Sequence, residues 1–110
     1  MEFIKNLPDT VSNLSSLIEY RQGRVVSMSL TRCEHYQMML MAVSEGEEVT
    51  SEQYPGDTIY YVLDGIMPLE KENETLILKT GECLAIPANL PHAIGGQGNF
   101  KILQIMISAK

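Results

Sequence analysis

The chain has 110 residues, of which 45% are hydrophobic, and its formal net charge is −6. This length allows one domain with one core, and the composition is too apolar for a disordered segment. The acidic balance excludes nucleic acid and anionic membranes as favoured partners, because both require basic patches.

The first residues lack the basic region and the continuous apolar core of a signal peptide, and no apolar run approaches membrane-spanning length. We therefore expect a cytoplasmic protein. In that compartment Cys33 and Cys83 are expected to be reduced thiols, packed as small hydrophobic side chains.

Residues 1–24 are predicted to form an arm with a short helix. Pro8 and Asp9 provide a start signal, and Gly23 provides a stop. Between them, apolar side chains recur at helical spacing at Val11, Leu14, Leu17 and Ile18. A narrow apolar stripe usually faces a core, so we expect the helix to lie against the remaining domain, residues 25–110.

From residue 25 onward, the sequence consists of strand-forming runs separated by glycine, proline and charged turns. These runs are residues 25–31, 36–43, 58–63, 66–70, 75–78, 82–86 and 100–107. The run 36–43 is continuously apolar, which predicts a strand buried on both faces. Asp64 and Gly65 are expected to end a strand in a hairpin turn. Short strands with such turns indicate a sandwich or barrel.

Two glycine-bounded motifs carry polar residues at fixed spacing. The first is Gly46-x5-Glu52-x-Tyr54-x3-Thr58-x6-Gly65, and the second is Gly81-x5-Pro87-x-Asn89-x2-His92-x3-Gly96. This spacing resembles the two motifs of the cupins, which in metal-binding members read Gly-x5-His-x-His-x3-Glu-x6-Gly and Gly-x5-Pro-x-Gly-x2-His-x3-Asn. The resemblance covers roughly residues 25–107. It implies an all-β, antiparallel jelly-roll barrel of the cupin type, preceded by the short helix or arm.

The candidate ligand-binding residues are Glu52, Tyr54, Thr58, Tyr60 and His92. The first four have the same parity along the chain, allowing for the intervening turn. The cupin resemblance implies that they line the mouth of the barrel and that His92 faces them from the opposite strand. One imidazole, one carboxylate, phenols and a hydroxyl among apolar side chains suit a small-molecule pocket.

The cupin resemblance also raises the question of a metal. Three of the four metal-ligand positions differ here, because they hold Glu52, Tyr54 and Thr58, and only His92 is kept. His92 and Glu52 are acceptable ligands for a divalent transition metal, but tight sites usually have three or four protein ligands. We therefore expect a small organic ligand to bind in the barrel without a tightly bound metal.

The alternative is an enzyme. It would be either a metal-dependent dioxygenase or isomerase with an atypical site, or a metal-free catalyst in which His92 and Glu52 act as an acid/base pair. The sequence leaves both hypotheses open, together with a third, a scaffold whose barrel binds nothing. The resemblance further implies a homodimer, which would also cover edge strands and a second apolar face.

Overall fold

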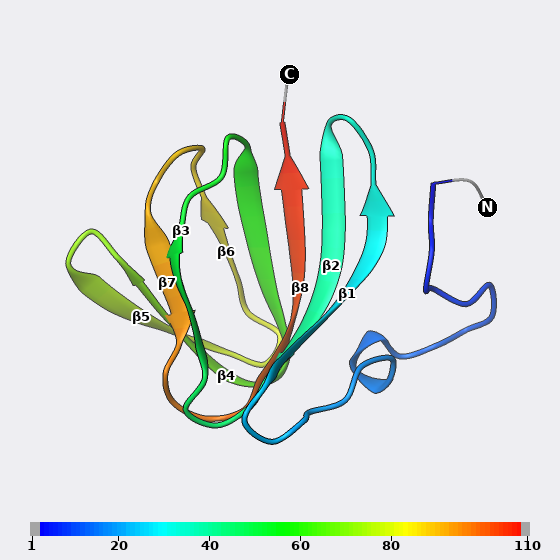
Figure 1. The fold of residues 1–110 in the computed structure, drawn as a ribbon, viewed down its shortest axis with the longest axis horizontal. Helices are drawn as coiled ribbons and strands as arrows, with labels where there is room; N and C mark the ends of the chain where they lie inside the picture. The colour runs from blue at the N-terminus through cyan, green and yellow to red at the C-terminus, as the bar shows by residue number, and fades with distance from the viewer. Residues whose placement is uncertain (1–2, 109–110) are drawn as a thin grey trace.

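The structure is a computed structural model that describes residues 3–108, except for the side chains of Ser51 and Glu52. In this part of the chain, eight antiparallel strands form one curled sheet in the order β1-β2-β8-β4-β7-β3, with β5 and β6 paired to β4 (Figure 1). The strands are β1 (Val25–Arg32), β2 (Tyr36–Val43), β3 (Glu48–Glu52), β4 (Asp57–Lys71), β5 (Glu74–Lys79), β6 (Cys83–Ile86), β7 (His92–Gly95) and β8 (Phe100–Ile107). The predicted all-β antiparallel jelly roll is confirmed. None of the described helices is long and apolar enough to cross a membrane.

Strand β4 connects the two halves of the barrel. Its first part, residues 57–65, pairs with β8 and β6, and its second part, residues 66–71, pairs with β5 and β7. We call the half with β1, β2, β8 and β6 half A, and the half with β3, β7 and β5 half B. Figure 1 shows the two halves as opposite sides of the curl.

The predicted hairpin turn at Asp64 and Gly65 is wrong, because β4 continues through both residues. The sheet bends there instead of reversing. A register shift lies between Val62 and Asp64, and Gly65 has a φ of +79°. Any Cβ at Gly65 would collide with the backbone carbonyl of Asn99. Glycine therefore provides the corner at which one strand passes from half A to half B.

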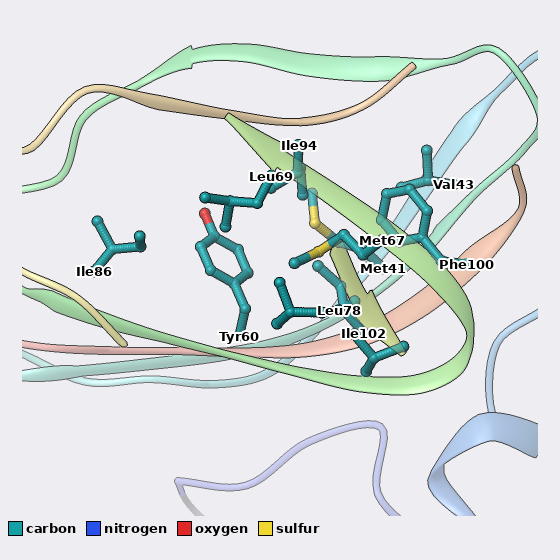
Figure 2. Close-up of a cluster of buried hydrophobic side chains, with 11 residues drawn as sticks. Met41, Val43, Tyr60, Met67, Leu69, Leu78, Ile86, Ile94, Phe100 and Ile102 are labelled. Atoms are coloured by element: carbon teal, nitrogen blue, oxygen red, sulfur yellow. The ribbon is translucent and has the colours of Figure 1, made fainter. Parts of the chain in front are cut away.

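The main core fills the space between the two halves. Residues on the inner face alternate with outward ones, as in the buried series Tyr60 and Val62 of β4. Figure 2 shows these side chains converging from both halves of the barrel. The buried cluster contains Met41, Val43, Tyr60, Val62, Met67, Leu69, Leu78, Ile86, Ile94, Phe100 and Ile102.

A second, smaller core lies on the outer face of half A, where the N-terminal arm packs. Only the second half of strand β2 is buried on both faces, whereas the sequence predicts this for the whole run. Leu40 and Ala42 face this outer cluster while Met41 and Val43 face the main core, and Tyr36 at the start of the strand is exposed. The arm contributes Leu7, Leu14, Leu17, Ile18 and Tyr20. The covering element for this face therefore comes from the chain itself.

The predicted N-terminal helix is only a 3₁₀ turn, η1 (Leu14–Ser16). Asn13 caps it, because its side-chain oxygen accepts from the Ser15 amide at 3.1 Å. Serine and asparagine compete for backbone hydrogen bonds and disfavour a longer helix. Val11, expected on the apolar face, is fully exposed.

The two cysteines are free thiols, but their packing differs from the expectation. Cys33 is half-buried and its sulfur lies 3.5 Å from the Thr31 hydroxyl oxygen. Cys83 is exposed, because it pairs with the partly exposed Tyr61 of β4 on the outer face of the barrel. The prediction of a packed Cys83 is therefore wrong.

Candidate functional site

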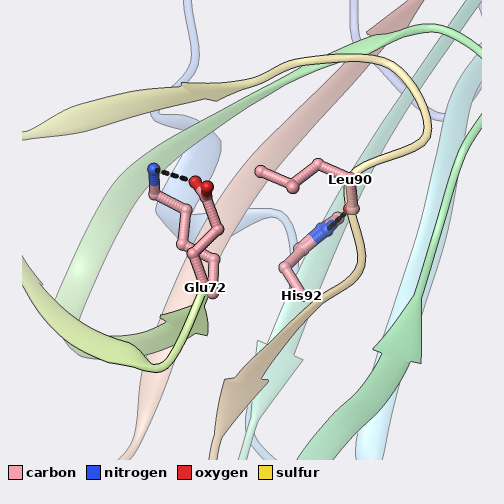
Figure 3. A network of polar contacts seen from close by, with 4 residues as sticks. Glu72, Leu90 and His92 are labelled. Atoms are coloured by element: carbon pink, nitrogen blue, oxygen red, sulfur yellow. Dashed lines mark hydrogen bonds and ion pairs between the residues drawn. The ribbon is translucent and has the colours of Figure 1, made fainter.

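His92 and Tyr60 form a buried hydrogen-bonded pair inside the barrel. The His92 ring lies beside the backbone of Leu90 (Figure 3), with Nδ1 2.9 Å from the Leu90 carbonyl oxygen. A carbonyl can only accept, so we assign the proton of the neutral ring to Nδ1. Nε2 is then an acceptor, and the Tyr60 hydroxyl donates to it at 2.6 Å. Both residues are among the predicted site residues, and the structure brings them together.

The two residues reach each other from opposite halves of the barrel. Tyr60 comes from the half A part of β4 and is 1% exposed, while His92 opens β7 in half B and is 5% exposed. Their rings meet edge to face, with centroids 5.5 Å apart. This geometry is favourable for aromatic pairs, so packing and hydrogen bonding hold the imidazole in the same place.

The other predicted site residues surround this pair to different degrees. Tyr54 lies in the connection between β3 and β4, and its ring centroid is 6.0 Å from that of His92. Thr58 is buried two residues before Tyr60, and its hydroxyl has no hydrogen-bond partner among the described residues. The backbone of Glu52 is in register with His92, but its side chain lies outside the described part of the structure.

The sequence interpretation missed a group of inward-facing residues on β2 and β8. Together with Tyr54, these side chains line a cavity of about 30 Å³; they are Gln37, Met39, Gln104 and Met106. A cavity of this volume holds about two water molecules. Gln104 could have been found from the sequence, because it has the same parity as the apolar Phe100 and Ile102 in the last alternating strand.

Lys71 is a further residue near the site. The sequence analysis left it in the charged connection between the runs 66–70 and 75–78. It is the last residue of β4 and pairs with His92 across the sheet, so both side chains start on the same face. Its Nζ lies 3.6 Å from Oε1 of Glu72, an ion pair visible in Figure 3. The connecting turn consists only of Glu72 and Asn73, both with positive φ.

The described side chains do not fit a transition-metal site. Nε2 of His92, the nitrogen that points into the barrel, accepts the Tyr60 proton instead. Among the described side chains near this ring, Tyr54, Tyr60 and Thr58 offer only phenol and hydroxyl groups, which are poor ligands in their neutral forms. Within the described residues, His, Cys, Asp and Glu side chains nowhere gather in a group of three or more.

The comparisons with known proteins agree with this barrel. Residues 39–106, more than half of the chain, match the family described as Cupin domain. The chain therefore belongs to the cupin family. No curated protein sequence matches it.

Similar solved structures share the fold over three quarters of the chain or more. A cupin superfamily protein from Desulfitobacterium hafniense is 39% identical, with a TM-score of 0.92 over 96% of this chain and 97% of that one. A conserved protein of unknown function from Streptococcus pyogenes is 22% identical, with a TM-score of 0.94 over 100% and 97% of the two chains. A salicylate 1,2-dioxygenase from Pseudoaminobacter salicylatoxidans is 14% identical, with a TM-score of 0.69 over 76% of this chain and 26% of that one. The latter two likenesses concern the fold alone.

Proposed function

We propose that this cupin binds a small organic molecule in its barrel, beside His92 and without a tightly bound metal. The observation that carries the proposal is the buried hydrogen bond from Tyr60 to Nε2 of His92. It gives the imidazole a hydrogen-bond donor in place of a metal and fixes the ring inside the barrel next to Tyr54, which lines a cavity with polar and apolar walls. Such a mixture is typical of small-molecule sites.

The size of the cavity sets a condition on the ligand. About 30 Å³ is far less than the roughly 300–1,000 Å³ of drug-sized pockets. Tyr54 forms part of the cavity wall and belongs to a connection, not to a strand. A ligand larger than about two waters therefore requires a wall of this cavity to move. We infer that Tyr54 moves, because it is the lining residue that lies outside the strands, in the connection between β3 and β4.

The test is a thermal-stability screen of small organic molecules against three forms of the protein: wild type, His92→Ala and His35→Ala. A true ligand should raise the melting temperature of wild type and His35→Ala, because His35 is partly exposed and does not line the cavity. It should raise that of His92→Ala much less. An equal rise in all three proteins would contradict the role of His92.

A second candidate function is metal-free proton transfer. The observation in its favour is the same 2.6 Å contact, because a phenol beside an imidazole provides two groups that exchange a proton over a short distance. Catalysis predicts that Tyr60→Phe keeps its fold and its ligand affinity but loses turnover. Ligand binding alone predicts that no screened ligand is converted by the wild-type protein.

A further inference from the structure

The inner face of half A changes from apolar to polar toward one end of the barrel. Residues paired directly across antiparallel strands share a face, so the register defines rows of neighbours. In the deeper row, Met41 pairs with Ile102, which pairs with Val62. The next two rows are Met39, Gln104 and Tyr60, and then Gln37, Met106 and Thr58. The polar side chains are therefore gathered in the two rows that adjoin the cavity.

One side chain in these rows, Thr58, is 1% exposed, and its hydroxyl has no hydrogen-bond partner among the described residues. It pairs across the sheet with the cavity residue Met106, and Gln104, which is 6% exposed, lines the same cavity with its polar side chain. Buried polar groups in native proteins are almost always hydrogen-bonded, because leaving them unpaired costs free energy. The unpaired Thr58 hydroxyl and the cavity-lining amide of Gln104 therefore point to a bound polar group at this end of the barrel.

We propose that this cavity is a subsite for an uncharged group that both donates and accepts hydrogen bonds, such as a carboxamide or a hydroxyl. The proposal rests on the proposed function and names the chemistry of one end of the ligand. The lining side chains of Gln37, Met39, Tyr54, Gln104 and Met106 carry no formal charge. A carboxylate or ammonium buried there would lack a counter-charge among the described lining side chains, which is costly.

The lining residues also match such a group in detail. A glutamine amide offers a donor and an acceptor side by side, which a carboxamide or hydroxyl can satisfy together. The thioethers of Met39 and Met106 are polarisable and flexible, so they adapt to the carbon atoms of the same group. The volume of about 30 Å³ suits only the end of a ligand. The rest of the molecule would extend toward Tyr54.

The test uses methionine labelled with ¹³C in its methyl group, so that Met39 and Met106 report on the cavity by NMR. Acetamide and acetate serve as probes at neutral pH, since they have the same shape and only acetate is charged. We expect acetamide to shift the Met39 and Met106 methyl signals saturably and acetate to leave them unchanged. Met28 and Met38, which pack in the outer cluster, should not respond to either probe.

Variants complete the test. Gln104→Met preserves side-chain length and should abolish the saturable acetamide shift. Gln22 is exposed, so Gln22→Met is the control and should retain the shift. Gln37→Met serves as a second cavity variant. Equal saturable shifts by both probes, no shift by either probe, or an unchanged response in both cavity variants would overturn the subsite. A screened ligand whose stabilisation depends on His92 would leave the proposed function standing even then.

Discussion

At the scale of single residues, the interior of this cupin is defined by a phenol that meets an imidazole. The Leu90 carbonyl fixes the tautomer of His92, and the Tyr60 hydroxyl then donates to the remaining ring nitrogen. Both partners are almost completely buried. A hydrogen bond of this kind is expensive to break on one side only, because the other partner stays desolvated and unpaired.

Replacing Tyr60 with Phe is therefore expected to lower the free energy of unfolding by about 1–3 kcal/mol, since Nε2 of His92 loses its donor. Urea unfolding followed by circular dichroism measures the change. The neighbouring Tyr61→Phe is the matched control, because Tyr61 is 38% exposed and points to the outer face. Equal losses in the two variants would show that the hydroxyl of Tyr60 makes no special contribution.

The residues of the site are only partly predictable from the sequence. Parity along β4 is enough to place Thr58 and Tyr60 on the inner face, and the motif spacing is enough to select His92. The inward face of Gln104 follows from its parity with Phe100 and Ile102, whereas Lys71 escapes prediction because its position depends on the residue that it pairs with across the sheet. Register between strands distant in the sequence is not encoded in any local pattern.

At the scale of elements, the molecule depends on one strand that serves both halves of the barrel. Asp64 and Gly65 predict a turn in the sequence, because Asp-Gly usually marks a hairpin. The same positive φ and missing side chain instead allow β4 to bend past the backbone of Asn99. A local signal for unusual backbone geometry does not distinguish a turn from a bend, since both need glycine.

Gly65→Ala is expected to destabilise the protein by about 3 kcal/mol or more, because the strain of a positive φ adds to a steric collision with Asn99. Gly81→Ala is the control. Gly81 also has a positive φ, of +89°, but a Cβ added there would have no other atom within 4 Å, so only the backbone strain of about 1–2 kcal/mol applies. Denaturant unfolding measures the loss of unfolding free energy in each variant. Similar losses would refute the close approach at the corner.

The N-terminal arm is the second element that the sequence predicts only approximately. Its contact with the barrel is confirmed, whereas its helix does not form, because packing and capping outweigh the spacing of a few apolar residues. The Tyr20 hydroxyl donates to Asp64 at 2.5 Å, and Lys101 donates to the Ser15 carbonyl at 2.6 Å. These two hydrogen bonds therefore add to the apolar packing of the outer cluster in holding the arm against the barrel.

Within the arm, Ile18→Ala is expected to cost about 2–5 kcal/mol of unfolding free energy, because Ile18 is 4% exposed in the outer core. Val11→Ala should change it by less than about 0.5 kcal/mol, since Val11 is fully exposed. Both substitutions shorten a β-branched side chain in the same segment, and urea unfolding compares them. A small loss in both variants would mean that the arm contributes little to the stability of the barrel.

At the scale of the whole molecule, the cupin fold is the most predictable feature. Glycine spacing and short strands specify a barrel, because they fix where the chain turns and which face of each strand is apolar. What the barrel holds is less predictable, since Tyr54 and Thr58 stand at positions where the motif of metal-binding cupins has ligands, and the fold is the same. The fold therefore places the site, and the side chains inside it decide its chemistry.

The central claim is that Tyr60, and not a metal, partners the imidazole of His92. Elemental analysis by mass spectrometry tests this most directly, on untagged wild type and His92→Ala purified without chelators or a nickel column. We predict only traces of transition metal in both proteins. A near-stoichiometric metal in wild type that is lost in His92→Ala would contradict the claim and would favour the metal-dependent enzyme.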